Sequence, residues 1–152
     1  MIRVMFTCHG NICRSTMSEF LFRDMVEKMG LGHKFYIASS ATSREEIGNG
    51  VHYGTRKVLD RFNIDYSKKR AVQLVRGDLE KYDYFIGMDS ANIRNMTAIL
   101  GDGEKVYKFL EFAGSRDDIA DPWYTGNFEE TYQDVIKGCK GFIEYLKGEG
   151  KI

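Results

Sequence analysis

Residues 2–25 read IRVMFTCHGNICRSTMSEFLFRDM, and this stretch predicts a strand, a loop and the start of a helix. Residues 2–7 are apolar and rich in strand formers, as in a buried strand. Gly10 then breaks the pattern. Apolar side chains recur at helical spacing beyond it, at Met17, Phe20, Leu21 and Met25. We therefore expect a helix from about residue 15, with Thr16 and Glu19 as a candidate capping box.

The same alternation of strand and helix continues along the chain. Further strands are expected at residues 35–39, 82–88 and 105–110, and further helices at 51–62, 90–100 and 128–146. Asp89 or Ser90 could cap the helix at 90–100, and residues 111–127 read as a long irregular stretch. This order predicts one α/β domain over residues 1–152, in which helices cover both faces of a central four-stranded parallel sheet. Ligands of such folds bind at the carboxyl ends of the strands, where Cys8 lies.

The composition argues against several classes of function. Lys and Arg number 22 and Asp and Glu also number 22, so no net charge favours nucleic acid or an anionic membrane as the main partner. No window approaches the ~20 consecutive apolar residues that span a bilayer. The N-terminus MIRVMFTCHG lacks the layout of a signal peptide. We therefore expect a cytoplasmic protein, with export by another route still open, and we expect a monomer.

The chain has three cysteines, which are Cys8, Cys13 and Cys139. An odd, low number of cysteines is a poor disulfide framework, and in a reducing compartment such residues are catalytic, redox-active or simply buried. No pair of cysteines has zinc-finger spacing, and the three histidines are scattered along the chain. We expect neither a metal ion nor another cofactor.

The loop from Cys8 to Ser15 carries a cysteine six residues before an arginine, between a strand and a helix. Successive backbone N–H groups of a tight loop can converge on an anion, and the helix N-terminus adds donors and a positive dipole end. Arg14 can grip two oxygens of a phosphate, and Gly10 permits turns that other residues resist. The same donors would stabilise a thiolate at Cys8, which is the nucleophilic form. The loop could therefore bind a phosphoryl group and attack it.

Simpler interpretations of this loop also exist. Cys8 could be a buried cysteine at the end of a strand, and Arg14 could be a surface residue. The position between a strand and a helix, followed by Ser15, favours the catalytic interpretation. An ATP-type phosphate loop is excluded, because no GxxxxGK followed by Ser or Thr is present.

A second segment far downstream, Asp121-Pro122-Trp123-Tyr124, completes a resemblance to a known family. With a Cys-x5-Arg-Ser loop after the first strand, the sequence resembles the low-molecular-weight protein tyrosine phosphatases. Residues 41–43, 46–49 and 88–89 match as well, so the resemblance spans essentially the whole chain. It implies a three-layer, phosphotyrosine phosphatase I-like fold with flavodoxin-like topology. It also implies hydrolysis of protein phosphotyrosine and of small aryl phosphates.

The resemblance implies catalytic roles for the matching residues. Cys8 would attack phosphorus and form a phosphocysteine intermediate, while Arg14 and the loop amides would bind the phosphoryl oxygens. Asp121 would protonate the leaving oxygen and then activate water. Asp121 also has support of its own, because Pro122 is the only proline and fixes the backbone beside it. The alternative, a solvated loop aspartate, is disfavoured by the presence of Cys8 and Arg14.

Other loop residues would support this chemistry. Ser15 would hydrogen-bond the thiolate, and Asn11 would hold the shape of the loop with Ser43 as its partner. The phosphate-binding loop would be completed by His9, Gly10, Ile12 and Cys13. The resemblance implies that Cys13 can form a reversible disulfide with Cys8 under oxidants. A small loop-packing residue is an equally good interpretation of Cys13.

The predicted substrate pocket is aromatic on one side and acidic on another. Trp123 and Tyr124 could line a slot for a phenyl ring, although the family usually has tyrosine at the first of these positions. Glu45 stands where an aromatic wall residue is common, and an acidic wall would favour basic peptides. His9 replaces a residue that is often apolar. Lys68 stands where a histidine supports the loop in some members.

Ile12 bears on the choice of substrate. Relatives that dephosphorylate arginine carry threonine at this position, whereas isoleucine can pack on an aromatic ring, which favours phosphotyrosine. Arsenate reductase shares the fold and the loop but needs further reactive cysteines, and Cys139 lies on the apolar face of the last predicted helix. A phosphoprotein-binding module would not need Cys8 together with Asp121. A flavodoxin-like nucleotide binder would have a loop rich in hydroxyl groups and glycine.

Overall fold

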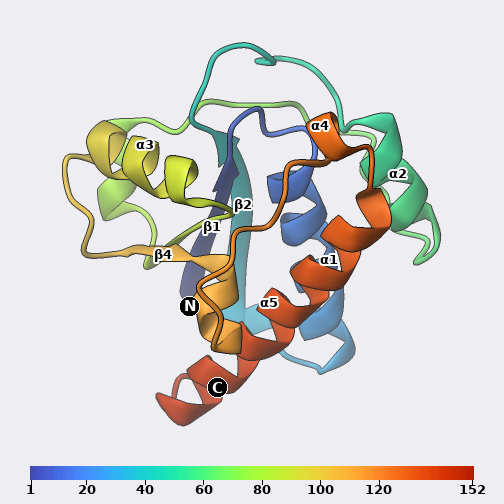
Figure 1. The fold of residues 1–152 in the computed structure, drawn as a ribbon. Helices are drawn as coiled ribbons and strands as arrows, with labels where there is room; N and C mark the ends of the chain where they lie inside the picture. The colour runs from blue at the N-terminus through green and yellow to red at the C-terminus, as the bar shows by residue number, and fades with distance from the viewer.

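The computed structural model describes residues 1–152 and contains one sheet of four parallel strands in the order β2-β1-β3-β4 (Figure 1). The strands are β1, Ile2–Cys8; β2, Phe35–Ala41; β3, Tyr84–Gly87; and β4, Val106–Lys108. β1 pairs on one side with β2, where Cys8 lies opposite Ala41, and on the other with β3, where Thr7 lies opposite Gly87. The last residues of three strands therefore meet at one edge, and the predicted four-stranded parallel sheet is confirmed.

Helices cover both faces of this sheet, as the sequence predicts. α1 (Arg14–Lys28), α2 (Tyr53–Asp60) and α5 (Phe128–Gly148) lie on one face, and α3 (Ser90–Leu100) lies on the other (Figure 1). α4 (Pro122–Thr125) is a single turn that precedes α5. The 3-10 helices are η1 (Gly32–Lys34), η2 (Arg76–Glu80) and η3 (Phe109–Ala113). None of the helices combines the length and the apolar character needed to cross a membrane.

The central strand divides the core into two parts. Successive strand residues point to opposite faces, so a strand covered on both sides must be apolar throughout. Phe6 faces α1, where its ring packs against Phe22 at a centroid distance of 5.8 Å. Met5 faces α3, in a smaller cluster that includes Met96 and Leu100. The buried apolar residues Val4, Met5 and Phe6 of β1 thus contribute to the packing on both faces of the sheet.

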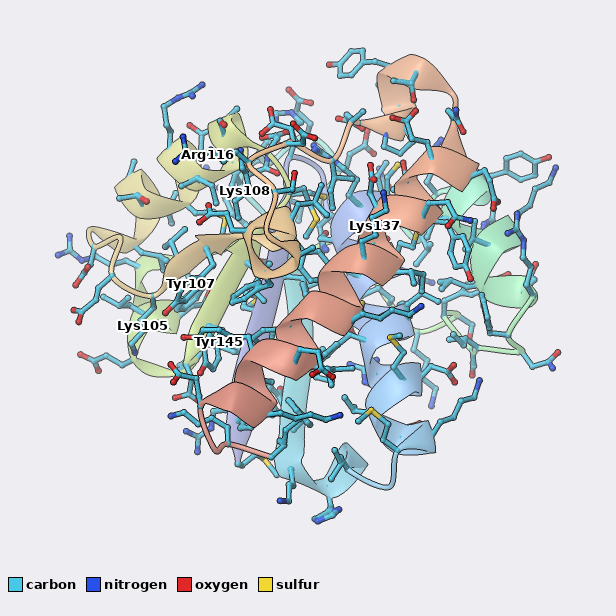
Figure 2. All side chains as sticks on the ribbon, turned by 60° about the horizontal axis from the view of Figure 1, so that its bottom comes forward. Lys105, Tyr107, Lys108, Arg116, Lys137 and Tyr145 are labelled. Carbon is cyan, nitrogen blue, oxygen red and sulfur yellow. The ribbon has the colours of Figure 1, made fainter.

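Aromatic rings hold α5 along the sheet. Phe142 of α5 packs against Phe22 and Phe112, with ring centroids 5.3 Å and 4.8 Å apart. Phe112 also contacts Tyr107 of β4 and Tyr145 of α5, whose side chains lie on the same side of the molecule in Figure 2. These contacts set the course of α5, and the chain that enters it carries the α4 turn to the carboxyl edge of the sheet (Figure 1).

Several local predictions differ from the structure. The capping box at Thr16 and Glu19 is wrong, because α1 already begins at Arg14 and Thr16 Oγ1 donates to the Cys13 carbonyl at 3.0 Å. Glu19 is instead buried. Residues 111–127 are not irregular throughout, since they contain part of η3 and all of α4. Asp89 caps α3 as predicted, and its side chain accepts the Asn92 N–H at 2.7 Å.

Candidate active site

The loop between β1 and α1 wraps around the sulfur of Cys8. Cys8 is the last residue of β1, Arg14 is the first of α1, and Asn11 between them has a φ of 58°. The Cys8 Sγ lies 3.1 Å from Ser15 Oγ and accepts the Ser15 N–H at 3.4 Å. The thiol therefore sits at the N-terminus of α1, where the helix dipole and a hydroxyl both favour a negative charge.

Asn11 fixes the shape of the loop through three hydrogen bonds. Its Nδ2 donates to Ser15 Oγ at 2.8 Å and to Ser39 Oγ at 2.9 Å, and its Oδ1 accepts the Val72 N–H at 3.1 Å. These bonds offset the unfavourable left-handed backbone of a residue other than glycine. The supporting role predicted for Asn11 is consistent with this geometry.

The predicted partner of Asn11, Ser43, is wrong. Ser39 takes this place because it lies on β2 directly opposite Phe6, two residues before the loop begins. Ser43 lies beyond the end of β2, and its Oγ accepts only the Glu45 N–H, at 3.4 Å. Residues 39–43 contain three serines, and the pairing of β2 with β1 determines that Ser39 is the one that meets Asn11.

A buried carboxylate, that of Glu19, lies behind Ser39. Ser39 Oγ donates to Glu19 Oε1 at 2.5 Å, and Arg23 donates to the other oxygen of Glu19 at 2.7 Å. Lys69 Nζ donates to the Ser39 carbonyl at 3.0 Å and lies 3.8 Å from Glu19. Burial lowers the pKa of Lys69, and the charge of Glu19 opposes that shift. The resemblance aligns Lys68 with the histidine that supports the loop in some members, but in this structure Lys69 makes the contacts behind the loop and Lys68 is exposed.

Arg14 is buried and connects the loop to two distant carboxylates. Its Nη1 donates to Asp89 at 2.7 Å and to the Ile119 carbonyl at 2.8 Å, and its Nη2 donates to Asp121 at 3.4 Å. Burial alone would lower the pKa of Arg14, but Cys8, Asp89 and Asp121 together raise it. The guanidinium therefore stays charged and fixed at the floor of the site.

Asp121 reaches the loop from a segment more than 100 residues away in sequence. It caps α4, with Oδ1 accepting the Trp123 N–H at 3.1 Å and Oδ2 turned toward Arg14. Pro122 is buried at the first position of α4, where a missing N–H costs nothing. The carboxylate of Asp121 is about a quarter exposed, so it can exchange a proton with a bound ligand.

One pocket of about 100 Å³ gathers most of the predicted site residues. Its lining consists of Cys8, His9, Gly10, Ile12, Cys13, Arg14, Glu45, Glu46, Asp121, Trp123 and Tyr124. Asn11 and Ser15 lie outside this lining and act on the loop from behind. His9 Nε2 lies 3.0 Å from Glu45 Oε2, which joins the loop to the opposite rim. Trp123 and Tyr124 are exposed at the mouth of the pocket.

The thiols of the other two cysteines, Cys13 and Cys139, favour the protonated form. All three cysteines are free and buried. Burial, followed by the charges of Cys8 and Asp121, raises the pKa of Cys13, and burial raises the pKa of Cys139. Cys139 belongs to the main hydrophobic core, as predicted. No group of three or more His, Cys, Asp or Glu side chains could hold a metal ion.

Several residues of the site were missed from the sequence. Ser39, Glu19 and Lys69 form the support behind the loop, and Thr55 Oγ1 donates to the Cys13 carbonyl at 3.1 Å. His52 donates its backbone N–H to the Ile12 carbonyl at 2.9 Å. No sequence motif indicates that these residues support the loop, because each reaches it through the tertiary fold.

A thiol at a helix N-terminus, a fixed guanidinium and a partly exposed carboxylate on one small pocket are suited to phosphoryl transfer through cysteine. The family model for low molecular weight phosphotyrosine protein phosphatases matches residues 3–152. The chain is 37% identical over 156 positions to the low molecular weight protein-tyrosine-phosphatase YfkJ of Bacillus subtilis, covering 100% of both chains. It is 35% identical to the low molecular weight protein-tyrosine-phosphatase PtpA of Staphylococcus epidermidis, over 96% of this chain and 94% of that one.

Solved structures agree with the sequence relatives. The crystal structure of YfkJ matches with a TM-score of 0.92 and 38% identity, over 98% of this chain and 96% of that one. The low molecular weight protein tyrosine phosphatase SP-PTP of Streptococcus pyogenes matches with a TM-score of 0.84 and 41% identity, over 96% and 93% of the two chains. The chain therefore belongs to the low-molecular-weight phosphotyrosine protein phosphatase family and is a protein-tyrosine phosphatase.

Proposed function

We propose that this phosphatase works in two steps, with Cys8 as nucleophile and Asp121 as acid and then base. The observation that carries the proposal is the convergence of Cys8, Arg14 and Asp121 on one pocket. In the first step the Cys8 thiolate forms a bond to phosphorus and the bond to the tyrosyl oxygen breaks. Asp121 gives its proton to that oxygen, so that a neutral phenol leaves.

In the second step the phosphocysteine is hydrolysed. Asp121, now a carboxylate, takes a proton from a water molecule as the water attacks phosphorus, and the bond to sulfur breaks. Inorganic phosphate leaves, the Cys8 thiolate is restored, and Asp121 is protonated again. Arg14 and the loop amides bind the phosphoryl oxygens in both steps, and Ser15 stabilises the sulfur as a leaving group.

The pocket supports an aromatic phosphoester as substrate. Ile12 and Trp123 both line the pocket, and their apolar side chains are suited to contact a phenyl group. Glu45 and Glu46 add negative charge to the rim, so peptides with basic residues beside the phosphotyrosine should be favoured. We also propose that the chain acts as a single monomeric domain in the cytoplasm, with the Cys8–Cys13 disulfide as its protection against oxidants.

An arsenate reductase would need a mobile, reactive cysteine to relay a disulfide, and Cys139 is buried in the core. Turnover on matched phosphotyrosine, phosphoserine and phosphoarginine peptides tests the proposed function. Hydrolysis should be confined to phosphotyrosine, should vanish in Cys8→Ser, and Ile12→Thr should raise the relative rate on phosphoarginine. Retained turnover in Cys8→Ser, or equal rates on phosphotyrosine and phosphoarginine in the wild type, would contradict it.

A further inference from the structure

His52 lies at a junction between the phosphate-binding loop and helix α2. Its backbone N–H donates to the Ile12 carbonyl at 2.9 Å, so its main chain is tied to the loop. It is also the N-cap residue of α2, because its Nδ1 accepts the Gly54 N–H at 3.0 Å. An accepting Nδ1 requires the neutral imidazole with its proton on Nε2.

The ring of His52 contacts two aromatic side chains, one in the α4 turn and one at the start of α5. It stacks on Phe128, the first residue of α5, with ring centroids 5.1 Å apart and planes inclined by 14°. It also meets Trp123 edge to face, with centroids 5.6 Å apart and planes inclined by 76°. Both geometries are favourable for aromatic rings. Since Trp123 directly follows Pro122 in α4, the ring contacts the turn that Asp121 caps.

The start of this segment is anchored, because Arg14 donates to the Ile119 carbonyl at 2.8 Å and Pro122 is buried. The part of the turn that carries Trp123 has fewer contacts with the loop. The bond from the Trp123 N–H to Asp121 lies within the turn and does not connect it to the loop. The contact from Arg14 to Asp121 is long, at 3.4 Å. Trp123 is 57% exposed, so few other side chains cover it. A four-residue helix has little rigidity of its own and needs an external contact to hold it.

We propose that His52 is a positioning residue that holds the Asp121-bearing turn at its working distance from the phosphate-binding loop, through its ring contact with Trp123. This inference rests on the proposed role of Asp121 as general acid. Proton transfer requires a separation of about 2.6–3.2 Å between the heavy atoms, so a small shift of the turn slows it. His52 connects both partners, because its main chain bonds the loop and its ring contacts the turn.

Gly54 makes this arrangement possible. A Cβ at this position would overlap the ring of Phe128, so only glycine lets that ring lie against α2 and stack on His52. The competing interpretation is that His52 is merely the cap of α2. The two roles need different properties of the side chain, since the cap needs a hydrogen-bond acceptor and the contact with Trp123 needs an aromatic ring. Two substitutions therefore separate them.

His52→Asn keeps a capping acceptor and removes the ring, whereas His52→Phe keeps a ring and removes the acceptor. The measurement is kcat/KM for a series of aryl phosphates with increasingly poor leaving groups, because only poor leaving groups need the acid. His52→Asn should lose about tenfold on phenyl phosphate and less than about twofold on a dinitrophenyl phosphate, as a shifted catalytic group would. His52→Phe should recover most of the loss on phenyl phosphate, despite a lower Tm.

Equal losses on both substrates in His52→Asn, or no recovery in His52→Phe, would overturn the inference. The same series in an Asp121→Asn background separates it from the proposed function. There His52→Asn should add no further loss, because the acid it positions is absent. If Asp121→Asn alone slows both substrates equally, the acid role of Asp121 fails. If Asp121→Asn discriminates between them and His52→Asn does not, only the role of His52 fails.

Discussion

The environment of Arg14 leads to a prediction for Asp89→Asn. The Arg14 side chain is 2% exposed, and the Asp89 carboxylate provides its shortest contact, at 2.7 Å. Asparagine can keep the second task of Asp89, which is to accept the Asn92 N–H at the start of α3. Its amide cannot neutralise the guanidinium. The substitution therefore removes one charge from a buried pair and leaves the helix cap in place.

The expected loss of stability follows from the charge that remains unpaired. Breaking a buried ion pair by removing one partner costs about 3–5 kcal/mol. The loss here should be smaller, at about 2–3 kcal/mol, because Asp89 is about a fifth exposed and both Ile119 and Asp121 still accept from Arg14. For a domain of this size that corresponds to a fall in Tm of about 4–12 °C. We also expect kcat/KM to fall by about tenfold, because the guanidinium loses its shortest ionic contact and is held less accurately against the phosphoryl oxygens.

Thermal unfolding followed by circular dichroism measures the first effect. Asp118→Asn is the matched control, because Asp118 also accepts a hydrogen bond at the start of α3, from Ser90, but is half exposed beside Lys108. An exposed pair of this kind contributes at most about 1 kcal/mol. Saturating phosphate should restore more of the Tm in Asp89→Asn than it adds to the wild type, since the dianion replaces the lost charge. A Tm for Asp89→Asn no lower than that of Asp118→Asn would refute the reasoning.

Two further predictions concern packing and the thiols. Gly54→Ala should destabilise the protein by about 1–3 kcal/mol in urea unfolding, because the new methyl group overlaps Phe128. The control is Gly148→Ala, whose added Cβ meets nothing within 4 Å and which should therefore show no loss of stability. Similar losses in both variants would contradict the packing argument. Burial raises the pKa of Cys13 and of Cys139, so both thiols should stay protonated up to about pH 9. Iodoacetate reacts with the thiolate and not with the thiol, so these two cysteines should resist it. Mass spectrometry of the native protein at pH 8 should therefore find carboxymethylation at Cys8 alone, and rapid labelling of either other cysteine would count against this assignment.

The sheet and the chemical residues could be predicted because their signals are local. A strand buried on both faces, a loop and an amphipathic helix are each encoded within a few consecutive residues, and Cys8, Arg14 and Asp121 stand in motifs. The support behind the loop could not be predicted in the same way. Ser39 rather than Ser43 meets Asn11, because β2 pairs in register with β1, and Lys69 rather than Lys68 turns inward. Which of two like residues close in sequence contacts the loop depends on the strand register and on the direction of each side chain, and neither can be read from the sequence alone.

The capping box at Thr16 was wrong for a related reason. Its pattern is a real helix-start signal, but the N-cap of α1 is Cys13, three residues before Thr16, and the Ser15 N–H points to the sulfur of Cys8. Glu19, which the pattern assigned to the capping box, instead accepts a hydrogen bond from Ser39 inside the protein. A functional site thus overrode a local preference, as is common where binding groups occupy a helix terminus.

Trapping the covalent intermediate tests the central claim most directly. Asp121→Asn should be mixed with an activated aryl phosphate, whose leaving group needs no acid, so that the first step stays fast while hydrolysis of the intermediate loses its base. After an acid quench, peptide mass spectrometry should find one phosphoryl group on Cys8, and none when Cys8→Ser is added to the same variant. Phosphorylation of any other residue, or release of phenol with no phosphorylated Cys8, would contradict the account.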